Sequence, residues 1–271
     1  GFAVVSSDYS SSSIALLDAA GMPWEEVYLH SGSVPLRLGL PLSGDVVLPT
    51  GQQEPGVLTL LDRYFSDVIT RIDLRAGEVL GQLKTHTPFS EGDRQAYSSN
   101  PQDYVWFSPD EAWVSRHEPN PEAAPDSIDG GSDLLRVSPG TMTRVEQRID
   151  LSGLNTVAAA VDTQPEQTRT AHARPGRMVR MGEWLVVGLA RMSLGFDAIG
   201  PGMVALVQPA EQRVVGVRLD GVVNCTQVAT VPGDETLVVV GCDGFHRDAP
   251  RTRAGLAWLR IAPDGEATVE Q

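Results

Sequence analysis

The chain has 271 residues, a formal net charge of −14 and 41% hydrophobic residues. This length is enough for a substantial core, as one large all-β domain or as two small domains. The acidic balance argues against nucleic acid or an anionic membrane surface as a partner, because both require a basic face. Apolar runs stay well short of the roughly 18 residues that span a bilayer, so we expect no transmembrane segment.

Short strands and tight turns are predicted from the N-terminus onward, because apolar and polar residues alternate with the strand period. The first unit has three expected strands, Phe2–Ser7, Ile14–Asp18 and Trp24–Leu29. The second unit has four, Val34–Leu42, Val57–Arg63, Asp67–Leu74 and Glu78–Leu83. The apolar stretch Val46–Thr50 either pairs inside this unit or extends one of its neighbours. A polar loop, Thr85–Asn100, follows.

The same pattern continues in three further units, in which turn residues such as Pro, Asp and Gly separate the strands. The third unit contains Tyr104–Ser108, Ala112–Arg116, Leu134–Val137 and Arg144–Leu151, and the long loop Ser152–Ala173 follows it. The fourth contains Met178–Met181, Trp184–Arg191, Met203–Val207 and Val214–Leu219. The fifth contains Cys225–Val231, Thr236–Cys242, Leu256–Ala262 and Ala267–Val269.

Four-stranded units that recur at roughly 50 residues are typical of a β-propeller, in which each blade packs against its neighbours. We therefore expect one all-β domain over residues 1–271; the alternative is a β-sandwich. The expected blades are 1–31 (partial), 33–84, 101–152, 174–220 and 223–271. Because the first unit lacks an innermost strand, we expect an incomplete ring of a longer six- or seven-bladed propeller; the alternative is a five-bladed ring with an imperfect seam.

The stretch LLDRYFSDVITRIDLRAGEVLG, within Val57–Leu83, resembles the YVTN-type blade of quinoprotein amine dehydrogenase-like and surface-layer-like bacterial propellers. The segment Ser66–Val79 follows the D-x-V-x-x-I-D-L-x-x-G-x-V pattern of that family closely, and Phe2–Gly21 follows it more loosely. The chain also resembles uncharacterised secreted or lipoprotein propellers of myxobacteria-like bacteria. Neither resemblance implies one activity, because propellers support many functions.

Long loops gather on one predicted rim. If strands A to D of a blade run outward from the axis, the long B–C and D–A loops share this rim, and binding residues concentrate on such loops. The candidate ligand-binding residues at the ends of the B strands are Asp8, Arg63, Arg116, His117, Arg191 and Asp243. Three arginines around one mouth would suit a carboxylate, sulfate or phosphate. The alternative is that each arginine pairs with a loop acid such as Glu118 or Asp197.

Cys225 and Cys242 are expected on neighbouring A and B strands of the fifth unit, at comparable distances from the turn at Pro232–Asp234. This placement predicts a disulfide and therefore an extracytoplasmic compartment; the alternative is two buried thiols. The acidic loop with Asp126, Asp129 and Asp133 could hold Ca²⁺, although a solvated turn fits its spacing better. No other cofactor or metal site is expected. The tryptophans at 106, 113, 184 and 258 are interpreted as blade packing.

Two functions compete at this point. The first is a non-catalytic binding or scaffold module whose protein or small-molecule ligand sits on the B–C and D–A rim. It would be periplasmic, secreted or an outer-membrane lipoprotein with an anchor upstream of Gly1. The second is a lactonase or quinoprotein-like enzyme that acts at the mouth of the central channel. The sequence contains no Gly-x-Ser-x-Gly elbow and no His-x-x-x-His pair to favour the second function.

Overall fold

The computed structural model describes residues 1–32, 38–51, 53–87, 97–124, 126–161, 163, 167–250 and 252–270. Within these ranges the chain is all-β and forms antiparallel sheets joined by turns, with only two short 3-10 segments. No helix in the described ranges has the length and apolar character needed to cross a bilayer.

Five sheets of three or four strands follow one another along the described chain, and each is built from consecutive strands. The first contains β1 (Phe2–Ser7), β2 (Ser12–Leu17) and β3 (Pro23–His30). The second contains β4 (Val46–Val47), β5 (Val57–Asp62), β6 (Val68–Asp73) and β7 (Glu78–Lys84). The third contains β8 (Pro101–Ser108), β9 (Glu111–Pro119), β10 (Gly131–Ser138) and β11 (Thr143–Asp150). The fourth contains β14 (Pro175–Met181), β15 (Trp184–Leu189), β16 (Gly202–Gln208) and β17 (Arg213–Leu219). The fifth contains β18 (Gln227–Val231), β19 (Asp234–Asp243), β20 (Ala254–Ile261) and β21 (Ala267–Glu270).

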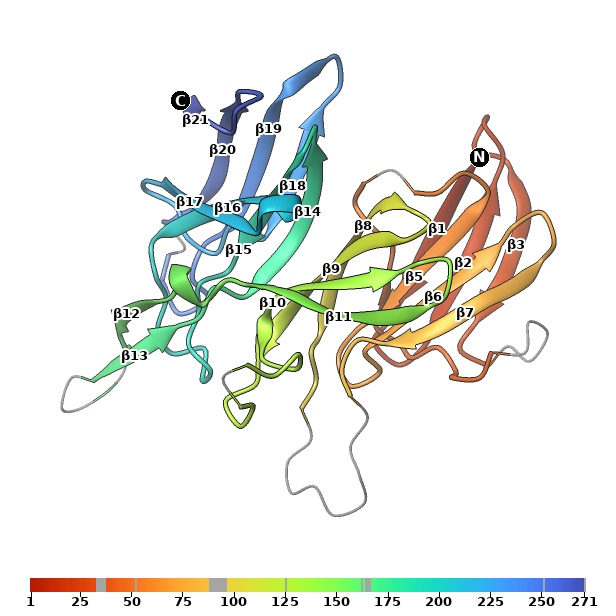
Figure 1. Ribbon diagram of the computed structural model, residues 1–271, viewed down its shortest axis with the longest axis horizontal. Helices are drawn as coiled ribbons and strands as arrows, with labels where there is room; N and C mark the ends of the chain where they lie inside the picture. The colour runs from red at the N-terminus through yellow and green to blue at the C-terminus, as the bar shows by residue number, and fades with distance from the viewer. Residues whose placement is uncertain are drawn as a thin grey trace.

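These sheets are the blades of a β-propeller. The inner strands of successive sheets lie side by side at the axis, where β14 contacts β8 and β18, the first strands of the neighbouring sheets. On its other side β8 contacts β5, the second strand of the second sheet. Figure 1 shows the sheets following one another from the red N-terminal sheet to the blue C-terminal sheet on the opposite side of the view. The expected fold class is confirmed, because four-stranded antiparallel sheets repeat around an axis.

The core lies between the blades rather than inside any one of them. Ile14 and Leu29 of the first sheet pack against Leu58 and Leu60 of the second. Similar buried clusters join the second sheet to the third, the third to the fourth and the fourth to the fifth. Each blade therefore buries its apolar faces against its neighbours, and this burial is the main force that holds the arrangement together.

The sequence of β5 shows how a blade serves two neighbours. Successive side chains of a strand point to opposite faces. Leu58 and Leu60 accordingly face the first sheet, while Leu61 packs in the cluster shared with the third sheet. All three side chains are at most 5% exposed, so the strand reads as a continuous apolar run.

The inner strand of the second blade differs from the prediction. The expected strand Val34–Leu42 lies partly outside the described residues, and its described part, residues 38–42, forms no strand. The inner strand is instead β4, in which Val46 pairs with Asp62 and Val47 with Leu61. The stretch Val46–Thr50 therefore pairs inside its own blade over its first two residues.

The expected loop Ser152–Ala173 also contains secondary structure. A 3-10 turn, η1 (Ser152–Leu154), leads into a hairpin of β12 (Thr156–Ala159) and β13 (Thr168–Ala171). Beyond the hairpin, His172 forms a bridge with Met192 in the long loop of the fourth blade. The hairpin is thus anchored to the loop that follows β15 (Figure 1).

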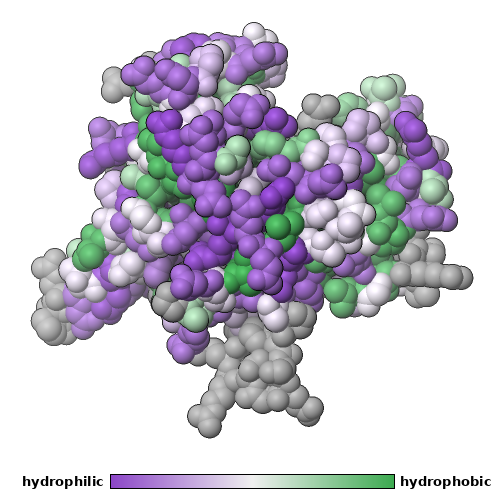
Figure 2. Space-filling model, in the orientation of Figure 1, coloured by the Kyte–Doolittle hydropathy of each residue, from purple (hydrophilic) through white to green (hydrophobic). Residues whose placement is uncertain are grey.

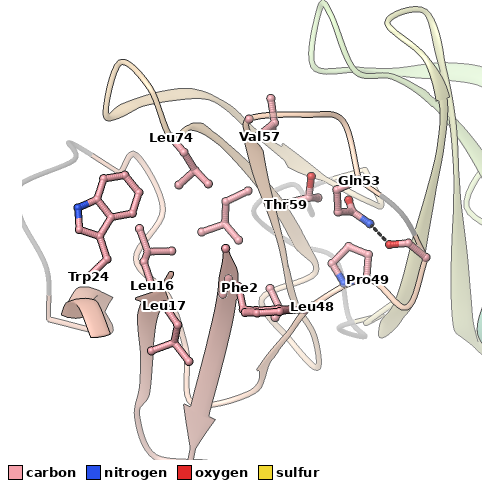
Figure 3. A pocket seen from close by; sticks show the side chains of 15 residues that line it. Phe2, Leu16, Leu17, Trp24, Leu48, Pro49, Gln53, Val57, Thr59 and Leu74 are labelled. Carbon is pink, nitrogen blue, oxygen red and sulfur yellow. Dashed lines mark hydrogen bonds between the residues drawn. The ribbon is translucent and has the colours of Figure 1, made fainter. Parts of the chain in front are cut away.

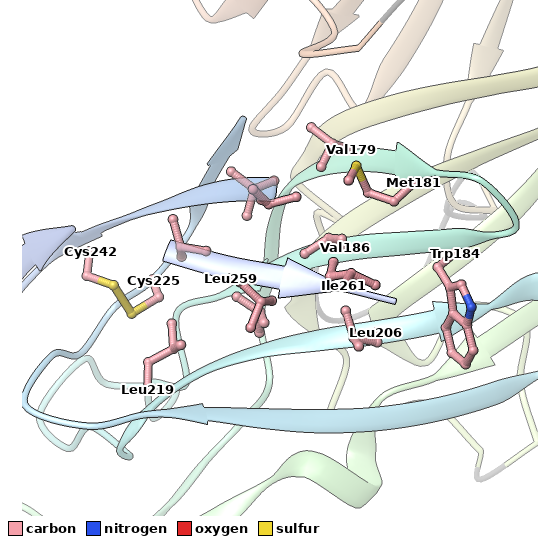
Figure 4. Close-up of a cluster of buried hydrophobic side chains, with 14 residues drawn as sticks. Val179, Met181, Trp184, Val186, Leu206, Leu219, Cys225, Cys242, Leu259 and Ile261 are labelled. Carbon is pink, nitrogen blue, oxygen red and sulfur yellow. A yellow bond between two sulfur atoms is a disulfide. The ribbon is translucent and has the colours of Figure 1, made fainter. Parts of the chain in front are cut away.

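The disulfide joins Cys225 and Cys242, as the sequence predicted. Cys225 lies just before β18 rather than on it, and its N–H donates to Leu189 O of the fourth sheet at 2.9 Å. A Cβ at Gly188 would lie 2.6 Å from Cys225 O, so glycine is required for this close approach. Figure 4 shows the bridge at one end of the apolar cluster between the fourth and fifth sheets.

The first and fifth sheets expose large apolar side chains, among them Phe2, Trp24, Leu256 and Trp258. Figure 2 shows apolar residues at its right-hand edge, over the first sheet. Trp24 is 73% exposed and Leu256 is 68% exposed, in contrast to the buried side chains of the clusters between the sheets.

Candidate functional site

A cavity of about 790 Å³ lies on the axis, at the rim formed by the A–B turns. We call it the axial cavity. It collects residues from the ends of β8, β14 and β18 and from the connection that follows β4. Its lining residues are Thr50, Gly51, Gln53, Pro55, Val105, Trp106, Val179, Arg180, Gly182, Glu183, Ala229 and Thr230. Four blades therefore contribute to one cavity, at the rim opposite to the predicted one.

The wall of the axial cavity combines apolar surface with one pair of opposite charges. Val105, Trp106 and Val179 supply apolar surface. The Arg180 guanidinium lies 4.0 Å from the centroid of the Phe107 ring, its Nε donates to Gly182 O at 2.9 Å, and its Nη2 is 3.9 Å from Glu183 Oε1. Because the ring contact and the carbonyl bond hold the guanidinium itself in place, Arg180 presents a positioned cation to the cavity.

A polar clamp on the A strands supports the axial cavity. The buried carboxylate of Asp103, on β8, accepts the N–H of Thr50 at 2.9 Å and the N–H of Met178 at 2.7 Å. Arg177, on β14, donates from Nη1 to Leu48 O at 3.0 Å and to Gln102 O at 2.8 Å. Asp103 and Arg177 therefore tie the second, third and fourth blades together at the axis, and Thr50 links this clamp to the cavity wall.

Burial governs the charges of the clamp. It raises the pKa of the Asp103 carboxyl, while the charge of Arg177 and the two backbone N–H groups act in the opposite direction. Burial likewise lowers the pKa of Arg177, against the attraction of Asp103. The separation between Arg177 Nη1 and Asp103 Oδ1 is 4.0 Å, so backbone groups satisfy most of the hydrogen bonds of both side chains.

At the opposite rim, the structure brings Arg63 and His117 into one neighbourhood. Arg63 Nη2 pairs with Asp45 at 2.5 Å, and Nη1 donates to Gln102 at 3.0 Å. His117 Nδ1 is 3.2 Å from Pro175 O. Burial, followed by the positive charges of Arg174 and Arg63, lowers the pKa of His117 to about 3, so its ring is neutral at pH 7.

Arg116 is fully buried and is used inside the blade. It forms a two-pronged pair with Asp133, at 2.7 Å from Nε and 2.6 Å from Nη2. It also donates to Thr85 O and Ile128 O. Burial would lower the pKa of Arg116, but the charge of and hydrogen bonds to Asp133 outweigh it and raise this pKa. The guanidinium therefore has its donors occupied within the fold.

The remaining candidates of that rim lie apart and serve their own loops. Arg191 is 5% exposed and donates to Pro201 O and Leu154 O. The exposed Asp8 accepts the N–H groups of Ser11 and Ser10, which lower its pKa. Asp243 is exposed on the fifth blade. None of the six predicted residues lines the axial cavity. Two of the three predicted arginines pair with acids, Arg63 with Asp45 and Arg116 with Asp133, whereas Glu118 and Asp197 were the partners suggested from the sequence.

Two acids of the acidic loop pair with arginines of the protein itself. Asp133 pairs with Arg116, and Asp129 pairs with Arg144 at 2.8 Å. Asp126 lies in a turn and is exposed. Within the described ranges, no group of three or more His, Cys, Asp or Glu side chains is arranged to hold a metal ion.

The candidate residues predicted from the sequence did not include Trp106, Arg180, Asp103 or Arg177. A signal for the clamp is present, because Asp103 and Arg177 occupy the third position of β8 and β14, and both strands begin with proline. Opposite charges at equivalent positions of consecutive blades indicate a pair at the axis. Trp106 was interpreted as blade packing. That it also lines the axial cavity depends on how successive sheets curve around the axis.

Comparison with known proteins identifies the fold alone. No protein-family model and no curated protein sequence matches the chain. Among solved structures it is similar to Kuenenia stuttgartiensis hydrazine synthase, with a TM-score of 0.57 and 13% identity over 98% of this chain and 62% of that chain. It is also similar to a chain of the mitotic checkpoint complex, with a TM-score of 0.54 and 12% identity over 99% of this chain and 60% of that chain. The chain thus spans about three fifths of the length of these two structures. At this identity the likeness shows a shared architecture, and the function must be argued from the chain's own residues.

Proposed function

We propose that the chain is a non-catalytic binding module, built on YVTN-type blades, that works outside the cytoplasm and holds its ligand in the axial cavity. The observation that carries the proposal is the convergence of four blades on one cavity of about 790 Å³. This volume lies within the range of about 300–1,000 Å³ that is usual for small-ligand sites. The clamp of Asp103 and Arg177 makes the cavity wall rigid, which lowers the entropic cost of binding.

The lining indicates the chemistry of the ligand. Val105, Trp106 and Val179 suit an apolar group, and Arg180 suits a carboxylate placed beside that group. A short peptide segment or small acid that carries both features fits this wall. At the opposite rim, Arg63 and Arg116 are paired within the fold, so those two predicted residues offer a ligand less free charge than Arg180 does.

The proposed location rests on the disulfide between Cys225 and Cys242, since such bonds persist in oxidising compartments. A thiol titration of the denatured, non-reduced protein taken from its native host checks it. We expect no reactive thiol; two reactive thiols per chain would contradict an oxidising compartment.

Calorimetric titration tests the binding site. A panel of N-acetyl dipeptides with one apolar side chain is measured as free acids and as C-terminal amides. We expect saturable binding of at least one acid, weaker binding of its amide, and a loss of about tenfold in Arg180→Gln, because a charge-assisted hydrogen bond contributes roughly 1.5–3 kcal/mol. Arg218→Gln, on the exposed side of β17, is the matched control and should bind normally. Loss of binding in Arg63→Gln with normal binding in Arg180→Gln would move the ligand to the opposite rim.

A further inference from the structure

A second cavity, of about 740 Å³, lies between the first and second sheets. We call it the inter-sheet cavity. It lies near the start of β1 and β5 and the end of β2 and β6. In Figure 3, Trp24 and Leu16 lie across the cavity from Pro49 and Gln53, with Phe2 between them. Gly51 and Gln53 line both this cavity and the axial cavity, so the connection after β4 separates the two.

The lining of the inter-sheet cavity differs in charge from that of the axial cavity. Phe2, Leu16, Leu17, Trp24, Leu48, Pro49, Val57, Leu58 and Leu74 supply apolar side chains. None of the described residues that line it has a charged side chain, and Gln53 and Thr59 contribute the polar ones. A charged ligand would lose its hydration there with no charged side chain to pair with, so the side chains of the cavity favour uncharged ligands.

Two aromatic side chains remain exposed at this cavity although neighbouring apolar residues are buried. Phe2 is 60% exposed and Trp24 is 73% exposed, whereas Leu16 is 7% and Leu58 is 5% exposed. A molecule in the cavity would cover apolar ring surface that water otherwise contacts, which favours binding. Gln53 Nε2 donates to Gly51 O at 2.8 Å and so fixes the wall on the far side.

We propose that the inter-sheet cavity binds an uncharged, mainly apolar small molecule. The concave shape and a volume in the usual range for small ligands favour a small molecule over a flat protein surface. The uncharged lining selects neutral compounds. This inference does not depend on the ligand of the axial cavity, because the two sites differ in charge and are tested by different residues.

The test uses two fluorescent compounds with the same aromatic frame. N-phenyl-1-naphthylamine is neutral, whereas 1-anilinonaphthalene-8-sulfonate carries one negative charge. Both are titrated into the intact protein and into two variants, Trp24→Ala and Trp258→Ala. Trp258 is a matched control, since it is also an exposed tryptophan on a terminal sheet but does not line the cavity. Circular dichroism establishes that both variants are folded, and sedimentation velocity gives the oligomeric state.

We expect saturable, one-to-one binding of the neutral compound, at least tenfold tighter than the sulfonate. Trp24→Ala should weaken this binding about tenfold, the effect of losing one aromatic contact, and Trp258→Ala should leave it unchanged. Equal loss in both variants, non-saturable binding or preference for the sulfonate would overturn the proposal. Self-association that Trp24→Ala abolishes, without binding of the neutral compound, would assign the cavity to an interface between copies and would also overturn it.

Discussion

At the scale of single residues, arginine acts in this chain mainly as a cross-link between backbone segments. Arg116 donates to Thr85 O and Ile128 O, Arg177 to Leu48 O and Gln102 O, and Arg191 to Pro201 O and Leu154 O. The guanidinium has five donors in a planar fork, so one side chain satisfies carbonyls of two segments at once. Two of the arginines that were predicted from the sequence as a ligand site, Arg116 and Arg191, are therefore held by the fold.

Substitutions of Arg116 and Arg63 should have unequal effects on stability. Arg116→Met leaves Asp133 buried without its main partner and should lower the free energy of unfolding by about 3–5 kcal/mol. Arg63→Met breaks a partly exposed pair with Asp45 and should cost about 1 kcal/mol or less. Urea denaturation of both variants measures the difference; equal losses would show that the burial of Arg116 is misassigned.

His117 should make the protein less stable in acid. Its pKa is about 3 in the folded state and about 6.5 in an unfolded chain, because burial and Arg174 disfavour the charged ring. Between these values the unfolded state binds more protons, so stability present above pH 6.5 is lost as the pH falls toward 3, by up to about 1.4 kcal/mol per pH unit. His117→Gln should remove this contribution. Denaturation at several pH values checks it, and identical pH slopes for variant and wild type would contradict a neutral buried ring.

At the scale of elements, the hydrophobic pattern was sufficient to predict most strands of the five blades. Strands buried on both faces, such as β5 and β15, give strong apolar runs that turns interrupt. The two misread segments lack that signal. β4 pairs over two residues only, and the exposed hairpin of β12 and β13 buries little, with Val157 70% exposed. The hairpin is also joined to the fourth blade by the bridge from His172 to Met192, a tertiary contact that no local pattern encodes.

Removal of the disulfide should destabilise the fifth blade in particular. The bond closes a loop with a sequence separation of 17, which in the chain-entropy account stabilises the fold by about 3 kcal/mol. The double variant Cys225→Ala/Cys242→Ala should therefore lose about this amount. Relative to the wild type, amide hydrogen exchange in the double variant should accelerate more in β18 and β19 than in β5 and β6, because only β18 and β19 flank the bridge. Uniform acceleration across all blades would contradict a local role for the bond.

At the scale of the whole molecule, the propeller is held by contacts between sheets, both apolar and polar. Four buried clusters each join two consecutive sheets, and the clamp of Asp103 and Arg177 joins three blades at the axis. The sequence predicted the tiling of blades but not the axial cavity. Candidate residues were taken from the ends of the B strands, whereas the axial cavity is formed where the A strands of four blades converge. Which charged residues face the axis depends on the twist and curvature of successive sheets.

Asp103→Ala should affect both stability and binding. The substitution leaves the N–H groups of Thr50 and Met178 without an acceptor and should lower the free energy of unfolding by about 3–5 kcal/mol. Because Thr50 lines the axial cavity, affinity for its ligand should fall as well. Asp103→Asn keeps one acceptor and should recover part of both losses. Calorimetric titration measures the affinity and urea denaturation measures the stability of the same samples. Full affinity in Asp103→Ala would show that the clamp does not support the cavity.

The most direct test of the proposed axial site is the NMR spectrum of the indole N–H groups, since each of the five tryptophans gives one signal. Trp106 lines the axial cavity and Trp24 lines the inter-sheet cavity, so the two sites have separate reporters. Addition of the dipeptide acid that binds most tightly should shift the Trp106 signal and leave that of Trp24 in place. Saturable binding with no shift at Trp106 would contradict a ligand site on the axis.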